Sequence, residues 1–232
     1  MVIILVKMPA RIITWDYVVE LCKKLAKKIR EEGYKPDVII AIARGGYAPA
    51  RLLCDFLGIE NLLSIQSQHW TEAAISSGKA VLKFAYKIDM NGRKILIVDD
   101  IADTGKSIIT ARKFIEKNWN PAEIRIATMQ WIPKTCEIKP DFYIDEVKEW
   151  IWYQYPWTRL EDTTQFLRRM LREEGKEKKF WSYDEIIKKF IEWYGINVGK
   201  WYFKAAIAAL VEEGSLSIKE ENGKKVYYVV TN

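Results

Sequence analysis

The sequence predicts an α/β fold, in which a mostly parallel, twisted sheet is flanked by helices and followed by a small, mainly helical C-terminal region. Apolar runs of strand length lead through short loops into helical patterns at residues 38–57 and 94–118. Alternating strands and helices are typical of doubly wound parallel sheets, whose ligands bind at the carboxyl ends of the strands. Three helical patterns before a hairpin pattern, at residues 160–230, predict the C-terminal region.

The first predicted element is an amphipathic helix from residue 14 to about residue 32. Thr14 suits the N-cap, because its side-chain oxygen can accept from a first-turn N–H group, and Gly33 ends the helix. Strands are expected at 38–43, 62–67, 81–88, 94–99 and 124–130, with helices at 48–57 and 106–118. Residues 68–79 show no regular period, which predicts a long polar loop.

The most informative segment follows the fourth strand. Two adjacent acids, Asp99 and Asp100, come directly after the apolar run 95–98. The chain continues through Ala102, Asp103, Thr104, Gly105, Lys106 and Ser107 into a helical pattern. Unpaired N–H groups and the helix dipole favour an anion at such a helix start. Carboxylates beside an anion site suit a ligand that joins a phosphate to hydroxyls or a cation, as a ribose phosphate with magnesium does.

A second glycine-containing loop follows the strand at 38–43. Arg44 can bind a phosphate with two parallel hydrogen bonds, and Gly45 and Gly46 let the backbone approach a ligand closely. A helical pattern starts at once after this loop, so the loop is a second candidate anion site.

The segment 95–107 resembles the phosphoribosyl pyrophosphate (PRPP) fingerprint of the type I phosphoribosyltransferases, and residues 38–46 resemble their pyrophosphate loop. The resemblance implies the type I phosphoribosyltransferase fold. It implies that Asp99 and Asp100 hold the ribose hydroxyls, and that Asp100 contacts Mg²⁺ directly or through water. Arg44, Gly45 and Gly46 meet pyrophosphate. The 5′-phosphate is held by backbone N–H groups from Ala102 to Ser107, with the hydroxyls of Thr104 and Ser107.

The resemblance also assigns Asp103 and the loop at 68–79. Asp103 corresponds to the catalytic acid that takes or shares a proton at purine N7. The loop corresponds to a mobile segment that closes over PRPP. Its candidates for pyrophosphate contact, equally interpretable as solvated loop residues, are His69, Ser76, Ser77 and Lys79.

The base site is predicted at residues 148–157, which resemble the hood of the 6-oxopurine phosphoribosyltransferases. Residues 13–16 also look like the microbial xanthine-guanine members. Trp152, four residues before Pro156, fits the position that stacks on the purine, and Trp150 is the alternative. A place in the hydrophobic core is the competing interpretation of either indole.

Two positions depart from that subfamily. Its members carry a lysine after the fifth strand that donates to the purine O6, whereas this chain has Ile132, with Lys134 two residues later. Thr158 replaces an acid that helps to read a guanine amino group. Adenine offers an amino donor and needs an acceptor, such as a backbone carbonyl near Tyr153, so the pocket favours adenine.

The sequence therefore predicts a purine salvage enzyme, adenine phosphoribosyltransferase, which converts adenine and PRPP to AMP and pyrophosphate with Mg²⁺. Hypoxanthine, guanine or xanthine phosphoribosyltransferase is the first alternative. A DNA-binding regulator that senses a nucleotide is the second. A homodimer is expected.

Two domains are predicted, a catalytic domain with its hood at 1–159 and an accessory, winged-helix-like region at 160–232. Residues 160–232 hold 13 Lys and Arg against 12 Asp and Glu, so no clustered positive surface and no nucleic-acid partner are expected.

Bulk composition excludes several other classes. The chain of 232 residues has a formal net charge of +6, which suits anionic substrates. One histidine and three scattered cysteines form no metal or disulfide pattern. The apolar run at the start is too short for a signal peptide or a membrane span, which predicts a cytoplasmic protein without membrane attachment.

Overall fold

The computed structural model describes residues 7–72, 75–221 and 223–230. The chain forms two compact units. Among the described residues, the sheet unit contains 14–71 and 75–150, and the C-terminal unit contains 7–13, 72, 151–221 and 223–230. The predicted division at residue 159 stays a prediction about domains, and the compact units group the hood segment 151–159 with the C-terminal region instead.

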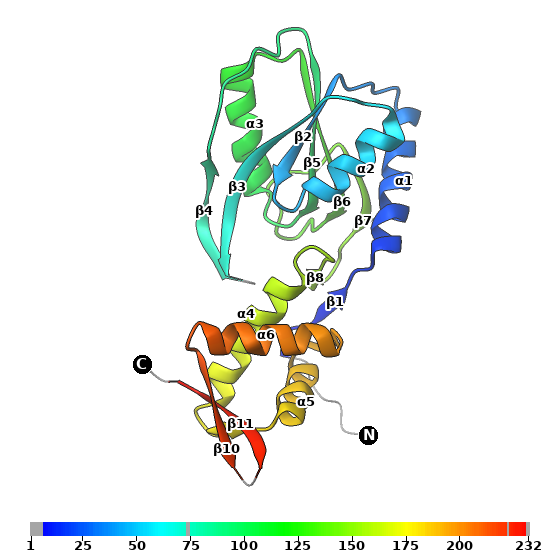
Figure 1. The fold of residues 1–232 in the computed structure, drawn as a ribbon. Coiled ribbons are helices and arrows are strands. Elements are labelled where there is room, and N and C mark those ends of the chain that lie inside the picture. The colour runs from blue at the N-terminus through cyan, green and yellow to red at the C-terminus, as the bar shows by residue number, and fades with distance from the viewer. Residues whose placement is uncertain (1–6, 73–74, 222, 231–232) are drawn as a thin grey trace. The chain divides into compact units, whose positions relative to one another are not determined.

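The sheet unit is built on six strands in the order β4-β3-β2-β5-β6-β7 (Figure 1). Strands β3, β2, β5, β6 and β7 pair in parallel. The elements are α1 (Trp15–Glu31), β2 (Val38–Ala43), α2 (Tyr47–Leu57), β3 (Leu62–Glu72), β4 (Ile75–Lys83), β5 (Lys94–Ala102), α3 (Lys106–Trp119), β6 (Glu123–Trp131) and β7 (Phe142–Glu146).

Both faces of this sheet are covered, as Figure 1 shows, with α1 and α2 on one face and α3 on the other. Alternate residues of each strand supply the two cores. Ile39 and Ala41 of β2 pack with α1 and α2, whereas Ile40 and Ile42 pack with α3. This explains why the central strands are continuously apolar, because parallel strands buried on both faces have no polar side.

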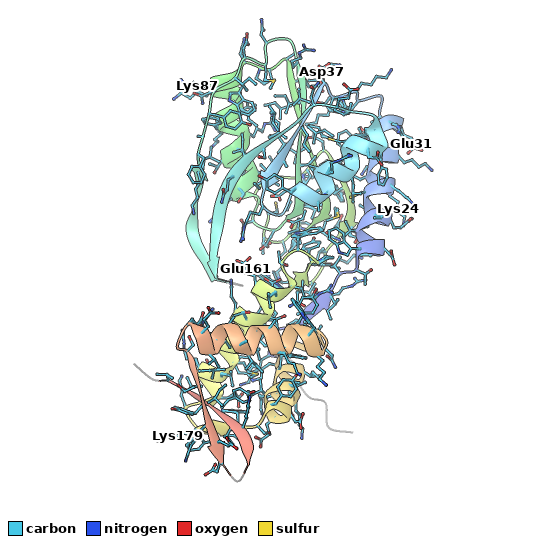
Figure 2. All side chains as sticks on the ribbon, viewed as in Figure 1. Lys24, Glu31, Asp37, Lys87, Glu161 and Lys179 are labelled. Carbon is cyan, nitrogen blue, oxygen red and sulfur yellow. The ribbon has the colours of Figure 1, made fainter. Side chains whose placement is uncertain are left out.

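The predicted start of α1 is confirmed. Thr14 is the N-cap, and its Oγ1 accepts from the Tyr17 N–H at 3.2 Å. Polar residues occupy the outer face of this helix, where Lys24 pairs with Glu20 and Lys27 with Glu31 at the i,i+4 spacing. The side chains of Lys24 and Glu31 are labelled in Figure 2, at the surface of α1.

The prediction of a polar loop at residues 68–79 is wrong. Its described backbone belongs to β3 and β4, which are neighbours in the sheet. Only residues 73–74 separate the two strands, a spacing that suits a hairpin. Strand β4 lies at the edge of the sheet. An edge strand need not bury one face, so no apolar alternation marks β4 in the sequence. The predicted strand at 81–88 is displaced for the same reason, and β7 was not predicted. The side chains of His69, Ser76, Ser77 and Lys79 lie outside the described part of the chain.

The C-terminal unit follows the predicted order of elements. Its elements are β1 (Ala10–Ile12), β8 (Trp152–Gln154), α4 (Arg159–Glu174), β9 (Phe180–Trp181), α5 (Tyr183–Tyr194), α6 (Lys200–Glu212), β10 (Leu216–Glu221) and β11 (Lys224–Val229). Strands β1 and β8 pair in parallel, and the others form a sheet in the order β10-β11-β9. The short strand β9 between α4 and α5 was not predicted, and the winged-helix-like character of this region stays a prediction.

Aromatic packing fills the core of the C-terminal unit. Tyr194 stacks on Phe166 at 4.3 Å between ring centroids, and its hydroxyl donates to the Phe166 carbonyl at 2.9 Å. The predicted capping box of α5 is confirmed, since Ser182 accepts from the Glu185 N–H and the Glu185 carboxylate accepts from the Ser182 N–H. None of the helices in the described residues has the length and apolar character that a bilayer span requires.

Candidate active site

The sheet has a topological switch point between β2 and β5. From β2 the chain passes through α2 to β3 on one side, and from β5 it passes through α3 to β6 on the other. In doubly wound sheets the crevice at the carboxyl ends of two such strands is where ligands bind. The two anion loops predicted from the sequence follow these two strands, so the topology brings them to the same place.

Glycine allows the two loops to touch. A Cβ atom on Gly45 would lie 2.3–2.8 Å from the Asp100 carboxylate atoms, and a Cβ on Gly46 would lie 2.4 Å from the Val98 carbonyl oxygen. Real Cβ atoms do not approach other atoms so closely. The first loop therefore lies against the end of β5 only because neither position has a side chain.

Strand β5 is longer than predicted, and this places the paired acids within it. The predicted strand 94–99 continues to Ala102, which pairs with Trp131 of β6. The pairing of β5 with β2 ends at Val98. Asp99 and Asp100 thus lie directly beyond the last residue of β5 that pairs with β2.

Asp99 is buried and Asp100 is partly exposed. Burial, followed by the charge of Asp100, raises the pKa of Asp99 well above its ordinary value. The Asp100 N–H donates to Asp99 Oδ1 at 3.0 Å, and the Ile101 N–H donates to Asp100 Oδ1 at 2.8 Å. Two carboxylates held together in this way favour a ligand that supplies hydroxyl donors or positive charge.

The second loop leads into α3 as an open helix start. Gly105 is the N-cap with φ of 76°, and neither a capping side chain nor an acid occupies the first turn. The Lys106 N–H lies 3.5 Å from Thr104 Oγ1. A helix start without a capping side chain leaves backbone N–H groups for an anion. Ser107 is partly exposed in this turn, as the predicted phosphate site requires.

Asp103 lies in the bend between β5 and α3, next to Thr135, which was not among the predicted site residues. Thr135 Oγ1 lies 2.9 Å from Asp103 Oδ1 and 2.9 Å from the Asp103 carbonyl oxygen. These residues are 32 positions apart, so no local sequence signal links them.

The candidate base residues of the sheet unit lie just after β6. Ile132 is 2% exposed, and its N–H donates to the Ala102 carbonyl at 2.9 Å. Lys134 is exposed in the following turn. An apolar side chain therefore occupies the position where the resemblance to 6-oxopurine enzymes implies a lysine that donates to the purine O6.

The other candidate base residues belong to the C-terminal unit. The Trp152 ring packs edge-on against Phe166 at 5.9 Å, so one edge of this indole is used by the core of that unit. Tyr153 is partly exposed, and its ring lies 6.4 Å from that of Tyr155. Stacking of Trp152 on a purine stays a prediction.

Thr158 has an acidic neighbour that sequence analysis missed. Its Oγ1 lies 2.7 Å from Asp162 Oδ2, and Asp162 is 5% exposed. The helical i,i+4 spacing could have revealed this pair, because Thr158 immediately precedes α4. The loss of an acid at residue 158 is therefore accompanied by a buried acid one helical turn away.

The residues of the crevice fit Mg²⁺ as a partner of the substrate. No group of three or more His, Cys, Asp or Glu side chains that could hold a metal occurs in the described residues. Mg²⁺ commonly binds through one or two carboxylates, water and substrate phosphates. The neighbouring side chains of Asp99 and Asp100 supply two carboxyl groups, with Asp100 partly exposed, and so suit such a contact.

The fold and the two loops define an α/β protein that binds its ligand at a topological switch point. The phosphoribosyl transferase domain family matches residues 11–158, and the chain belongs to this family. A xanthine-guanine phosphoribosyltransferase from Nitratidesulfovibrio vulgaris is 33% identical over 148 residues, which are 62% of this chain and 82% of that protein.

Two solved structures are similar to the same part of the chain. A purine phosphoribosyltransferase from Pyrococcus horikoshii is 33% identical with a TM-score of 0.55, covering 65% of this chain and 94% of its own. A hypothetical protein from Neisseria gonorrhoeae with bound ppGpp is 26% identical with a TM-score of 0.54, covering 68% and 93%. The predicted type I phosphoribosyltransferase fold is confirmed.

We expect Gly45→Ala to weaken PRPP binding by about tenfold while changing the melting temperature little. The new methyl group must displace the Asp100 carboxylate, which is the end of a short side chain and can rotate away. Titration calorimetry with PRPP and a thermal melt measure the two effects.

Gly33→Ala is the matched control, because Gly33 has φ of 68° and open space around it. That variant should lose about 1 kcal/mol of stability and keep its affinity. Equal PRPP affinities of Gly45→Ala and wild type would contradict the role of Asp100.

Proposed function

We propose that the protein is a purine phosphoribosyltransferase that transfers the ribose 5-phosphate of PRPP to a 6-oxopurine base and releases pyrophosphate. The convergence of the two anion loops at the β2–β5 switch point supports the PRPP site. The names of the relatives support the purine, since those at 33% identity are a xanthine-guanine and a purine phosphoribosyltransferase.

In this proposal, different segments of the crevice bind different parts of PRPP. The start of α3 binds the 5′-phosphate through its backbone N–H groups and the hydroxyls of Thr104 and Ser107. Asp99 and Asp100 accept hydrogen bonds from the ribose hydroxyls, and Arg44 binds the pyrophosphate. Asp100 would hold Mg²⁺ directly or through water, and the bound ion would neutralise charge on the pyrophosphate.

The reaction breaks the bond between C1′ and a pyrophosphate oxygen and forms a bond between C1′ and a purine nitrogen. Positive charge develops on the ribose as the first bond breaks, so the site acts chiefly by positioning and by charge stabilisation. The attacking base must lose a proton or share it through N7. Asp103 is the proposed acceptor for that proton.

The identity of the purine base depends on residues outside the two anion loops and on the relatives. The sequence favours adenine, because Ile132 and Thr158 stand where 6-oxopurine enzymes carry side chains that bind the oxo and amino groups of the base. Two observations favour a 6-oxopurine instead. Asp162 contacts Thr158 and supplies an acid close to the position of the lost one. The Neisseria protein was solved with ppGpp, a guanine nucleotide. Adenine remains the second candidate because the buried Ile132 offers no donor to an oxo group.

Pyrophosphate release with PRPP and each of four bases tests the proposal. We expect kcat/KM for guanine, xanthine or hypoxanthine to exceed that for adenine in the wild-type protein. A clear adenine preference would replace the 6-oxopurine proposal with adenine phosphoribosyltransferase. If none of the four bases supported pyrophosphate release, both proposals would be contradicted.

We expect Ile132→Lys to change the ratio of hypoxanthine to adenine use by about tenfold or more in favour of hypoxanthine. A buried lysine needs an acceptor such as O6, and an unsatisfied charged donor beside the adenine amino group costs more than about 1–3 kcal/mol. The ratio is taken on one preparation, so a reduced folded fraction does not affect it. Ile132→Met keeps the site apolar and should keep the wild-type ratio. An unchanged ratio in Ile132→Lys would show that residue 132 does not face the purine.

Residues 159–232 lie beyond the family match, and we propose an accessory role for them without nucleic-acid binding. Cations of this unit pair with its own acids, as Arg168 does with Glu213 and Lys178 with Glu185. On the hairpin, Glu220 and Lys225 are cross-strand partners. Such internal pairing leaves little clustered positive charge for a duplex. The homodimer expected from the resemblance stays part of the proposal.

A further inference from the structure

The chain after β6 lies alongside the loop that contains Asp103. It turns at residues 132–136, where the N–H groups of Thr135 and Cys136 both donate to the Ile132 carbonyl, at 3.2 and 3.0 Å. The Ile132 N–H donates to the Ala102 carbonyl at 2.9 Å, and the Glu137 N–H donates to the Thr104 carbonyl at 3.0 Å. Two backbone hydrogen bonds therefore bracket residue 103.

A side chain makes the contact between these two backbone bonds. The Thr135 hydroxyl lies 2.9 Å from both the carbonyl oxygen and Oδ1 of Asp103. A hydroxyl has one proton and donates to one of these oxygens at a time, yet both belong to the same residue. Thr135 is exposed, so packing does not explain its place.

The backbone of this segment is also held by contacts that do not involve Thr135. A Cβ atom on Gly105 would lie 2.9 Å from Cys136 Sγ and 2.7 Å from Ile138 Cγ2. Residues 136–138 thus pack directly on the glycine at the start of α3. Removing the Thr135 hydroxyl leaves this packing and the two backbone hydrogen bonds intact, so its effect should be confined to Asp103.

We propose that Thr135 is a positioning residue for Asp103, an inference that rests on the proposed function. By donating to Oδ1, and alternately to the adjoining carbonyl, the hydroxyl limits the rotation of the carboxylate that accepts the proton of the purine base. A general base works only within hydrogen-bond reach of its proton, and misplacement by about 1 Å can reduce the rate about 100-fold. PRPP affinity does not depend on this rotation, because in the proposal the phosphate is held mainly by backbone N–H groups and the ribose by Asp99 and Asp100.

The test compares Thr135→Val, which removes the hydroxyl at constant shape, with Thr135→Ser, which keeps it. In full-length protein with saturating PRPP and the best base, we expect Thr135→Val to lower kcat by roughly 10- to 100-fold. The KM for PRPP should change less than about threefold. Thr135→Ser should restore most of the turnover. Thr164→Val is the matched control, since the Thr164 hydroxyl donates to the Leu160 carbonyl within α4, and it should behave as wild type.

The outcomes separate this inference from the proposed function. Turnover of Thr135→Val within twofold of wild type would overturn the positioning role while leaving the enzyme assignment in place. Equal losses in the serine and valine variants would also overturn it, because the hydroxyl would then not be the cause. If Thr135→Val does not fold, Thr135→Ala serves the same comparison. A wild-type protein inactive with every purine base fails the proposed function itself, and PRPP titration still shows whether the site exists.

Discussion

Asp103→Asn is expected to reduce turnover by about 10²- to 10⁴-fold and to weaken PRPP binding by far less. Asparagine has the shape of aspartate and keeps an oxygen that can accept from the Thr135 hydroxyl 2.9 Å away. It cannot take a proton from the purine, and a positioned acid-base group contributes a factor of this size. Steady-state pyrophosphate release gives kcat, and titration calorimetry gives the PRPP affinity.

Asp103→Glu is the informative companion variant. It keeps the proton acceptor but moves the carboxylate outward by one methylene, so it should lose rate through misplacement alone. An Asp103→Asn protein with nearly full turnover would reduce Asp103 to an ordinary residue of the loop. A parallel loss of turnover and PRPP affinity would instead make it a binding residue.

The second large effect is expected at the paired acids. The double variant Asp99→Asn with Asp100→Asn should weaken PRPP binding by roughly 100-fold or more, since hydrogen bonds to charged groups are worth about 1.5–3 kcal/mol each. Calorimetric titration of PRPP measures this loss, and unchanged affinity would exclude the acids from the ribose site.

The same variant should be no less stable than the wild type in the absence of ligand. Burial and the Asp100 charge raise the pKa of Asp99, so the folded state binds its proton more tightly than the unfolded state does. The stabilisation is full below the ordinary pKa of aspartate and is lost as the pH rises through the raised value. Melting temperatures across that window should fall with rising pH in the wild type and fall less in the double variant. A steeper fall in the variant would contradict burial as the cause.

Local patterns predicted most helices and both anion loops. Thr14 and the Ser182–Glu185 pair mark helix starts through hydrogen bonds between near neighbours, and the structure has both. The loop at Arg44 and the loop that follows the paired acids of β5 were found because glycines and acids follow apolar runs at short fixed spacing. These signals depend on a few consecutive residues, so they are legible before the chain folds.

Edge strands and long-range partners were not predictable in this way. Residues 68–79, whose described backbone belongs to β3 and β4, were predicted as a loop, because an edge strand such as β4 needs no apolar alternation. The packing of Trp152 against Phe166 depends on α4 lying beside β8, which the resemblance to a base-stacking residue did not indicate.

The sequence was therefore sufficient for the fold class and for locating the two anion loops that are proposed to bind PRPP, because each rests on residues adjacent in the chain. Tertiary structure alone decided which residues stand beside them. It placed Gly45 against Asp100 at the switch point and Thr135 against Asp103 across 32 residues. Pairing in a parallel sheet joins segments far apart in sequence, and no local pattern encodes which side chains then meet.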